Sequence, residues 1–151
     1  MDAWVDGYLN SLQTQIMAVV IYNNQNQLVS GRFIYPYESQ MVCNVMNIQP
    51  DGIVPSLFTE QGTEYLKTNG VNFNDQRMRF INMDEKDDEG QQIIILAGKS
   101  DKDTPWIPAG AFVYKTPNQS TIAVCYGPEQ PKGVANEAAF KIVEALKGTG
   151  Y

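Results

Sequence analysis

The sequence contains no histidine among its 151 residues. Histidine is the commonest general acid–base group and metal ligand, and it is the usual partner of a catalytic serine or cysteine. Its glycines, at positions such as 110, 127 and 133, also lack the spacing of a phosphate-binding loop. Histidine-dependent catalysis is therefore excluded, and we expect a binding protein without a cofactor or metal. Catalysis by carboxylates alone stays open as an alternative.

Cysteine and long apolar runs are also scarce. The two cysteines, Cys43 and Cys125, lie in apolar surroundings without metal-binding spacing. This pattern indicates reduced, buried thiols in a cytosolic protein, although a disulfide between them stays open. The longest apolar run, 16–21, is far too short to cross a bilayer, and no basic segment precedes it. We therefore expect a cytoplasmic protein without a signal peptide.

Positive charge is in deficit, with 11 Lys and Arg against 17 Asp and Glu and a net charge of −6. Nucleic acid is therefore not expected as a partner, because phosphate binding needs concentrated basic side chains. The acidic cluster at 84–89 lacks the alternating ligands and central glycine of a calcium-binding loop. It is interpreted as a solvated connection between two strands.

No repeat or linker divides the chain, so one domain is expected over residues 1–151. Hydrophobic periodicity predicts seven strands and four helices. The strands are expected at 16–22, 28–35, 63–67, 76–83, 91–97, 111–116 and 120–126. The helices are expected at 2–12, 37–47, 54–61 and 133–147.

Short connections between the strands predict an antiparallel sheet, because parallel crossovers need longer links. The predicted fold is α+β, with the N- and C-terminal helices on one face of the sheet and two short helices on the other. In the last helix, one apolar face is expected to be buried: Ala135, Ala138, Ala139, Ile142, Val143 and Leu146.

This order of elements resembles the profilin fold, and four short segments resemble profilin motifs. They are WVDGYL at 4–9, GVNFNDQRMRFI at 70–81, KTPNQS at 115–120 and GVAN at 133–136. The third is similar to the final hairpin of alveolate profilins, those of apicomplexans and ciliates. Tyr151 is similar to the aromatic residue near the end of many profilins.

The resemblance implies a protein that binds monomeric actin and regulates filament assembly in the cytoskeleton. In the strand at 76–83, period-2 alternation directs Arg77, Arg79 and Ile81 to one side and Met78 and Phe80 to the other. Two arginines beside an isoleucine form a plausible contact surface; a plain solvated strand is the alternative. The actin-binding residues implied by the resemblance are Arg77, Arg79, Ile81, Lys99, Lys132, Gly133, Asn136 and Lys141.

A second site implied by the resemblance binds proline-rich segments, such as those of formins. Polyproline helices dock onto aromatic side chains, and Trp4, Tyr8 and Tyr151 are the expected contacts. Profilins have a tryptophan where this chain has Val29 and usually a tyrosine where it has Gly7, so weak binding is expected. The alternative is that these aromatics only pack the terminal helices together. The acidic balance argues against phosphoinositide binding, another activity of the family.

The 100–108 segment is longer than in typical profilins, and no role is assigned to it. A different protein class also fits the layering of helices and sheet. A longin-like trafficking or scaffold module without actin binding is the alternative to a profilin.

Overall fold

The computed structural model describes residues 7–9, 11–12, 14–34, 50–73, 75–84, 88, 90–100, 103 and 107–151. The centre of the fold is a seven-stranded sheet in the order β2-β1-β7-β6-β5-β4-β3. Every neighbouring pair of strands in it is antiparallel. The strands are β1 (Ala18–Tyr22), β2 (Leu28–Phe33), β3 (Val71–Phe73), β4 (Gln76–Asp84), β5 (Gln92–Ala97), β6 (Gly110–Lys115) and β7 (Thr121–Tyr126).

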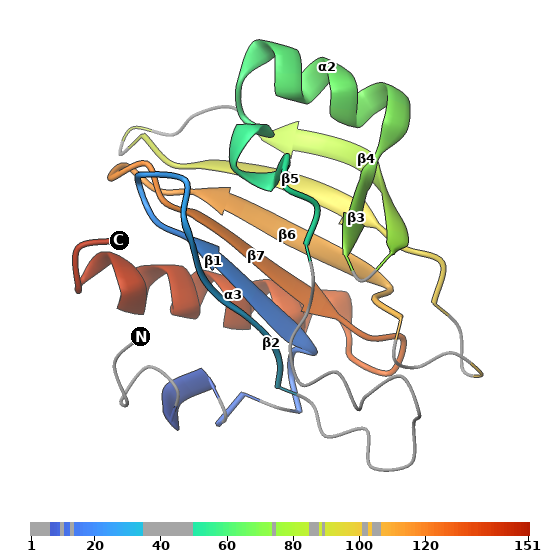
Figure 1. Cartoon of the computed structure of the whole chain (residues 1–151). Helices are drawn as coiled ribbons and strands as arrows, with labels where there is room; N and C mark the ends of the chain where they lie inside the picture. The colour runs from blue at the N-terminus through green and yellow to red at the C-terminus, as the bar shows by residue number, and fades with distance from the viewer. Residues whose placement is uncertain are drawn as a thin grey trace.

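One face of the sheet is covered by helix α3 (Lys132–Lys147), which lies behind the sheet in Figure 1. The predicted apolar face of this helix, Ala135 to Leu146, is fully buried against β6 and β7. Leu9 and Leu12 from the N-terminal segment join the same core, and residues 7–9 are helical. The terminal helical segments therefore share one face, as predicted.

The other face is covered by the 3₁₀ helix η2 (Val54–Ser56) and helix α2 (Glu60–Asn69), which lies over β4. A second core forms there from residues such as Leu57, Leu66, Phe73 and Met78. The two cores alternate along each strand, because neighbouring side chains of a strand point to opposite faces. The predicted helix at 37–47 lies outside the described residues.

The strand predicted at 63–67 is wrong, because these residues belong to α2. The helix has strong end signals. The Thr59 side chain accepts a hydrogen bond from the Gly62 backbone N–H at 3.0 Å, and Gly70 ends the helix with a positive φ of 74°. The seventh strand is instead β3. The helix predicted at 54–61 is likewise divided, since η2 ends at Ser56 and α2 begins at Glu60.

Candidate functional site: the open side of β4 and β5

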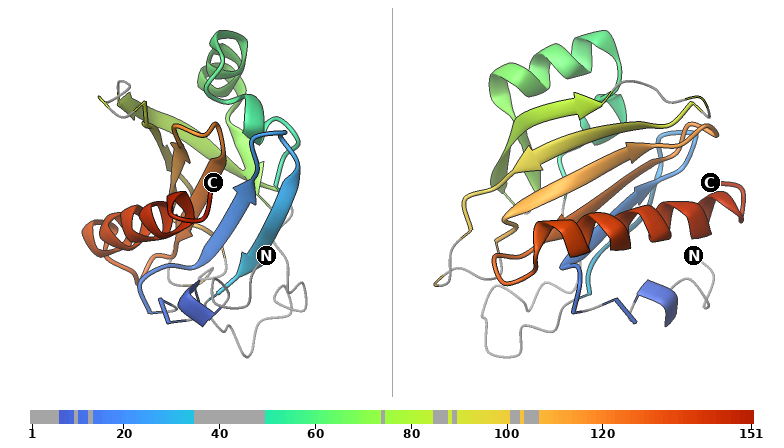
Figure 2. Two further views of the ribbon diagram at one scale, coloured as in Figure 1. Left: turned by 90° about the vertical axis from the view of Figure 1, so that its left-hand side faces the viewer. Right: turned by 180° about the vertical axis from the view of Figure 1, so that it is seen from behind.

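The α3-facing side of the sheet is covered only in part. Helix α3 packs chiefly on β6 and β7, and Figure 2 (right) shows β4 and β5 beyond its edge. On β5, Ile93 and Ile95 contact the core beneath α3 but remain only partly buried. An open strip of sheet therefore lies beside the helix.

Arg77 and Arg79 lie on this open side of β4. Arg79 pairs with Ala97 and Asn82 with Ile95, and directly paired residues point to the same face of a sheet. Both arginines are exposed, whereas Met78 between them is fully buried on the α2 side. Within the described part of the chain, neither arginine lies within ion-pair distance of a carboxylate. Two unneutralised guanidinium groups thus face solvent from one strand.

The predicted alternation of β4 ends at Phe80, because a bulge follows. Phe80 pairs with Leu96 and Asn82 with Ile95, so Ile81 has no partner of its own on β5. Strict alternation would have placed Asn82 on the α2 side, but the bulge returns it to the side of the arginines. Ile81 is 52% exposed. It is available for contact, although period-2 alternation does not determine its direction.

The flank of α3 forms a wall beside the open strip. A depression of 340 Å³ lies between α3 and the sheet, and its lining includes Ile93 on β5 and Tyr114 on β6. The remaining lining residues come from α3: Asn136, Glu137, Phe140 and Lys141. Asn136 and Lys141, two predicted site residues, therefore lie together beside the same strip.

Asn136 is held in place by a hydrogen bond from the sheet. The Tyr114 hydroxyl donates to its Oδ1 atom at 3.2 Å. Burial, and to a smaller extent the Asp84 carboxylate, raises the pKa of Tyr114 to about 12. The hydroxyl therefore stays protonated at neutral pH and keeps its role as a donor.

Lys99, Lys132 and Gly133 lie toward the end of the sheet at which Arg79 is found. Gly110 pairs with both Ala97 and Tyr126, and the chain reaches Lys99 just after β5. Helix α3 begins at Lys132 after the turn that follows β7, and both lysines are exposed. A Cβ atom on Gly133 would meet no atom within 4 Å, so this helix end is open to a partner.

Sequence reasoning did not select Phe140, although its side chain is 50% exposed and lines the depression. Ile93 and Ile95 were also not selected. One signal was present in the sequence: Phe140 is a large apolar residue outside the predicted buried face of α3. Single exposed apolar residues are common on protein surfaces, so the depression beside Phe140, and not its exposure alone, makes it a candidate contact residue.

The second predicted site lies at the other side of α3. Tyr8, Val29 and Tyr151 are all partly buried and pack against the core that contains α3. The structure therefore brings both described tyrosines to one core. Trp4 lies outside the described residues. Val29, on β2, packs against the same core.

Two comparisons with known proteins found nothing: no family model matches the chain, and no curated protein matches it. The solved structures do match. Profilin II of Acanthamoeba castellanii aligns with a TM-score of 0.60 and 17% identity over 99% of this chain and 98% of that profilin. Mouse profilin IIa, solved in complex with a double repeat from the FH1 domain of mDia1, aligns with a TM-score of 0.57 and 15% identity over 99% of this chain and 100% of that profilin. This protein has the profilin fold.

The profilin fold is shown by shape alone, since the identities are low. The layering of helices and sheet, which also fitted a longin-like module, therefore matches the profilin fold. The likeness of one hairpin to alveolate profilins stays a prediction, because the matches above are to an amoebal and a mouse protein. In the described part of the chain, no helix is long and apolar enough to cross a membrane, and no group of three or more His, Cys, Asp or Glu side chains could hold a metal.

Proposed function

We propose that this protein binds monomeric actin through the open side of β4 and β5 and the adjoining flank of α3, and thereby regulates filament assembly. The observation that carries the proposal is that Arg77 and Arg79 lie on the same uncovered side of a profilin-fold sheet as the depression lined by Asn136 and Lys141. The protein would act in the cytoplasm, as a binding protein and not as an enzyme.

The chemistry of the surface supports this partner. Protein interfaces commonly combine a partly apolar centre with arginine and a polar rim. Here Ile93, Ile95 and Phe140 provide the apolar part, and Arg77 and Arg79 provide the charge. Actin is acidic, and this chain carries a net charge of −6. Two exposed arginines would offset that repulsion locally and steer association.

Reversing the charge of the arginines tests the proposal. Arg77→Glu combined with Arg79→Glu should lower actin affinity at least about tenfold, because charge-assisted contacts are replaced by repulsion. Folding should survive, since exposed substitutions usually change the free energy of unfolding by only about 0.5 kcal/mol. Pyrene-actin assembly and sedimentation of monomeric actin complexes measure the effect, and wild-type binding should weaken with salt.

Lys67→Glu is the charge control for the single Arg79→Glu variant. Lys67 lies on α2, on the opposite face, and changes the net charge by the same amount. Arg79→Glu should weaken actin binding several-fold and Lys67→Glu should not. Equal losses would mean that only overall charge matters, and a folded double-arginine variant with full affinity would overturn the assignment of this face.

A second candidate function is binding of proline-rich segments, such as those of formins, by Tyr8 and Tyr151. It is favoured by the packing of both tyrosines on one core and by the mouse profilin IIa structure, which contains an FH1 double repeat. With Val29 in place of an aromatic residue, binding should be weak, because a stacked aromatic contact contributes roughly 1 kcal/mol.

Val29→Trp tests the position of this groove. The substitution should tighten binding of a polyproline peptide by about fivefold to tenfold, because it adds an aromatic surface to the core against which Tyr8 and Tyr151 pack. Fluorescence titration measures the affinity. The matched control is Leu28→Trp, since Leu28 is 50% exposed on the same strand and is not part of that core. Equal affinities for both variants and wild type would place the proline site elsewhere.

A further inference from the structure

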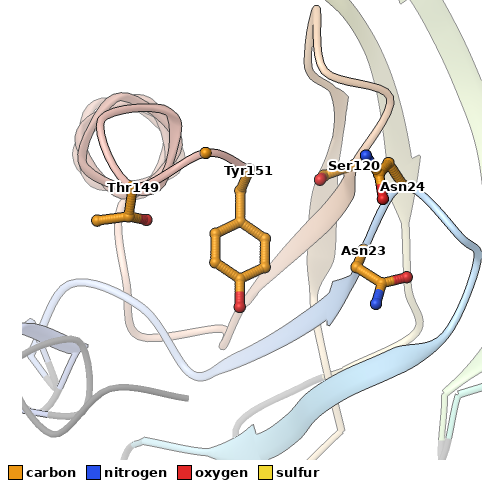
Figure 3. A pocket seen from close by; sticks show the side chains of 6 residues that line it. Asn23, Asn24, Ser120, Thr149 and Tyr151 are labelled. Atoms are coloured by element: carbon orange, nitrogen blue, oxygen red, sulfur yellow. The ribbon is translucent and has the colours of Figure 1, made fainter.

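A small polar pocket lies where α3 ends. Its volume is 260 Å³, and three turns line it. Asn23 and Asn24 come from the β1–β2 turn, Ser120 from the β6–β7 turn, and Thr149, Gly150 and Tyr151 from the segment after α3. Figure 3 shows Tyr151 between Thr149 on one side and Asn23, Asn24 and Ser120 on the other. Tyr151 thus belongs both to this pocket and to the core surface shared with Tyr8 and Val29.

The walls of the pocket are held by hydrogen bonds before any ligand arrives. The side-chain Oδ1 atom of Asn23 accepts hydrogen bonds from the backbone N–H groups of Gln25 and Gln27, at 2.9 and 3.0 Å. The Tyr151 backbone N–H donates to the Leu146 carbonyl at 3.2 Å, and Asn118 Nδ2 donates to the Tyr151 carbonyl at 3.3 Å. A site of this kind loses little conformational freedom on binding.

Other polar groups of the pocket are not used within the protein. Ser120 is only 2% exposed, yet its hydroxyl has no hydrogen-bond partner among the described residues. The Asn24 side-chain amide and the Tyr151 hydroxyl likewise form no bond within the described part of the chain. Buried polar groups normally have partners, so the buried Ser120 residue calls for a ligand or water, and the more accessible Asn24 and Tyr151 groups can contact the same ligand. Each of them both donates and accepts.

We propose that this pocket binds a neutral polar side chain, an amide or a hydroxyl, that flanks a proline-rich segment bound at Tyr8 and Tyr151. The inference rests on the proposed binding of proline-rich segments. Proline itself offers only carbonyl acceptors, because its nitrogen carries no hydrogen. It leaves the acceptor atoms of Asn24, Ser120 and Tyr151 unused, whereas a glutamine, asparagine or serine side chain can bond to donors and acceptors alike.

Acidic flanking residues fit this pocket less well. None of the six lining side chains is charged. An aspartate or glutamate would therefore find no cationic side chain there, and it would be repelled by a protein of net charge −6. The pocket therefore selects for hydrogen bonding without negative charge.

Peptide titration tests the inference. The probes are an uninterrupted run of prolines and the same run carrying Gln, Ser or Glu at either its N-terminal or its C-terminal end. At one of the two ends, the Gln and Ser peptides should bind about threefold to tenfold more tightly than the Glu peptide. Calorimetry or tyrosine and tryptophan fluorescence measures each dissociation constant.

Two variants connect the preference to the pocket. Ser120→Ala and Asn24→Ala should each reduce the preference for Gln and Ser to less than about twofold, because each removes a hydrogen-bonding group. The control is Gln25→Ala, an exposed side chain of the same turn that does not line the pocket, which should keep the full preference. Asn24 is exposed, so Asn24→Ala should fold even if the buried Ser120→Ala variant does not.

The outcomes distinguish a failure of this inference from a failure of the proposed binding of proline-rich segments. If every proline peptide binds equally well whatever its flank, or if the preference survives Asn24→Ala, the pocket assignment is wrong while the binding of proline-rich segments stands. If no proline peptide binds, both the pocket assignment and the proposed binding of proline-rich segments are wrong. If Gln and Ser peptides bind more tightly and both pocket variants lose that preference, the pocket is the selecting element.

Discussion

On the side of strand β4 that faces α2, Met78 is fully buried, whereas on the side that faces α3 its neighbours Arg77 and Arg79 are exposed. The buried side is sealed by α2, whose Lys67 ammonium lies 5.7 Å from the centre of the Phe80 ring. Among the described residues, no helix lies above the open side, because α3 packs on β6 and β7. One strand therefore stabilises the fold with one side and offers a surface with the other.

The same contrast separates two aromatic residues of nearly equal exposure. Tyr65 on α2 is 48% exposed and Phe140 on α3 is 50% exposed. Phe140 lines a depression beside the open strip, together with Ile93 and Lys141. Tyr65 lines neither of the two pockets described here. Exposure alone therefore does not identify a contact residue, and its neighbours on the surface must be considered.

The largest effect on stability is expected on the sealed side of β4. Met78→Ala should lower the free energy of unfolding by about 2–5 kcal/mol, because it removes a fully buried side chain and leaves a cavity. Denaturant unfolding measures the change. Arg77→Ala, one residue away on the open side, should cost no more than about 0.5 kcal/mol. Similar losses for the two variants would contradict the division of β4 into a sealed and an open side.

A smaller effect, on binding, is expected from the paired aromatic residues. Phe140→Ala should weaken actin binding about tenfold, since truncating an aromatic contact near the centre of an interface typically costs more than 1 kcal/mol. Tyr65→Ala should change it less than about twofold. Competition in pyrene-actin assembly compares the two. Were Tyr65→Ala the more damaging variant, the binding surface would lie on the α2 side.

The smallest effect concerns the alkaline stability of the α3 side. The pKa of Tyr114 is raised from its ordinary value of 10 to about 12, so the unfolded chain loses this proton first. The associated stability is present below about pH 10 and is lost as the pH rises toward 12. Tyr114→Phe should therefore flatten the decline in this range, while costing about 0.5–1.5 kcal/mol at pH 7 through the lost bond to Asn136.

Denaturant unfolding of wild type and Tyr114→Phe between pH 7 and about pH 11 makes this measurement. Burial also raises the pKa of Cys125, from 9 to about 12, which adds a decline of the same sign that both proteins share. The difference between the two curves therefore reports Tyr114 alone. Parallel curves above pH 10 would mean that this hydroxyl titrates alike in the folded and unfolded chain.

Much of the sheet could be predicted from local pattern, but two parts of it could not. The 63–67 segment, Thr-Glu-Tyr-Leu-Lys, is too short for its apolar pattern to distinguish a strand from a helix, and its only fully buried apolar side chain is Leu66. The N-cap at Thr59 and the C-cap at Gly70 favour a helix there. The phase of β4 beyond Phe80 also depended on pairing with β5, because a bulge has no periodic signature in the sequence.

The candidate site residues likewise divide into those that could be selected from the sequence and those that could not. The sequence was enough to select Arg77, Arg79, Asn136 and Lys141. The structure places the arginines on the open side of β4, and it places Asn136 and Lys141 beside Ile93 on the same side of the sheet. The sequence was not enough to select Phe140, because no sequence pattern says which surface of a helix adjoins an uncovered strand. Ser120 was also missed, since its burial depends on two other turns that lie far away in the chain.

The sequence by itself determined the α+β class, the antiparallel order and the buried face of α3, because hydrophobic periodicity and short connections act within a few residues of one another. Only the tertiary structure decided which strands of the sheet α3 leaves uncovered. Alternation along β4 tells which residues share a side, but the position of α3 over β6 and β7 leaves that side open. Such openness is a relation between elements that are distant in the chain, so no local pattern carries it.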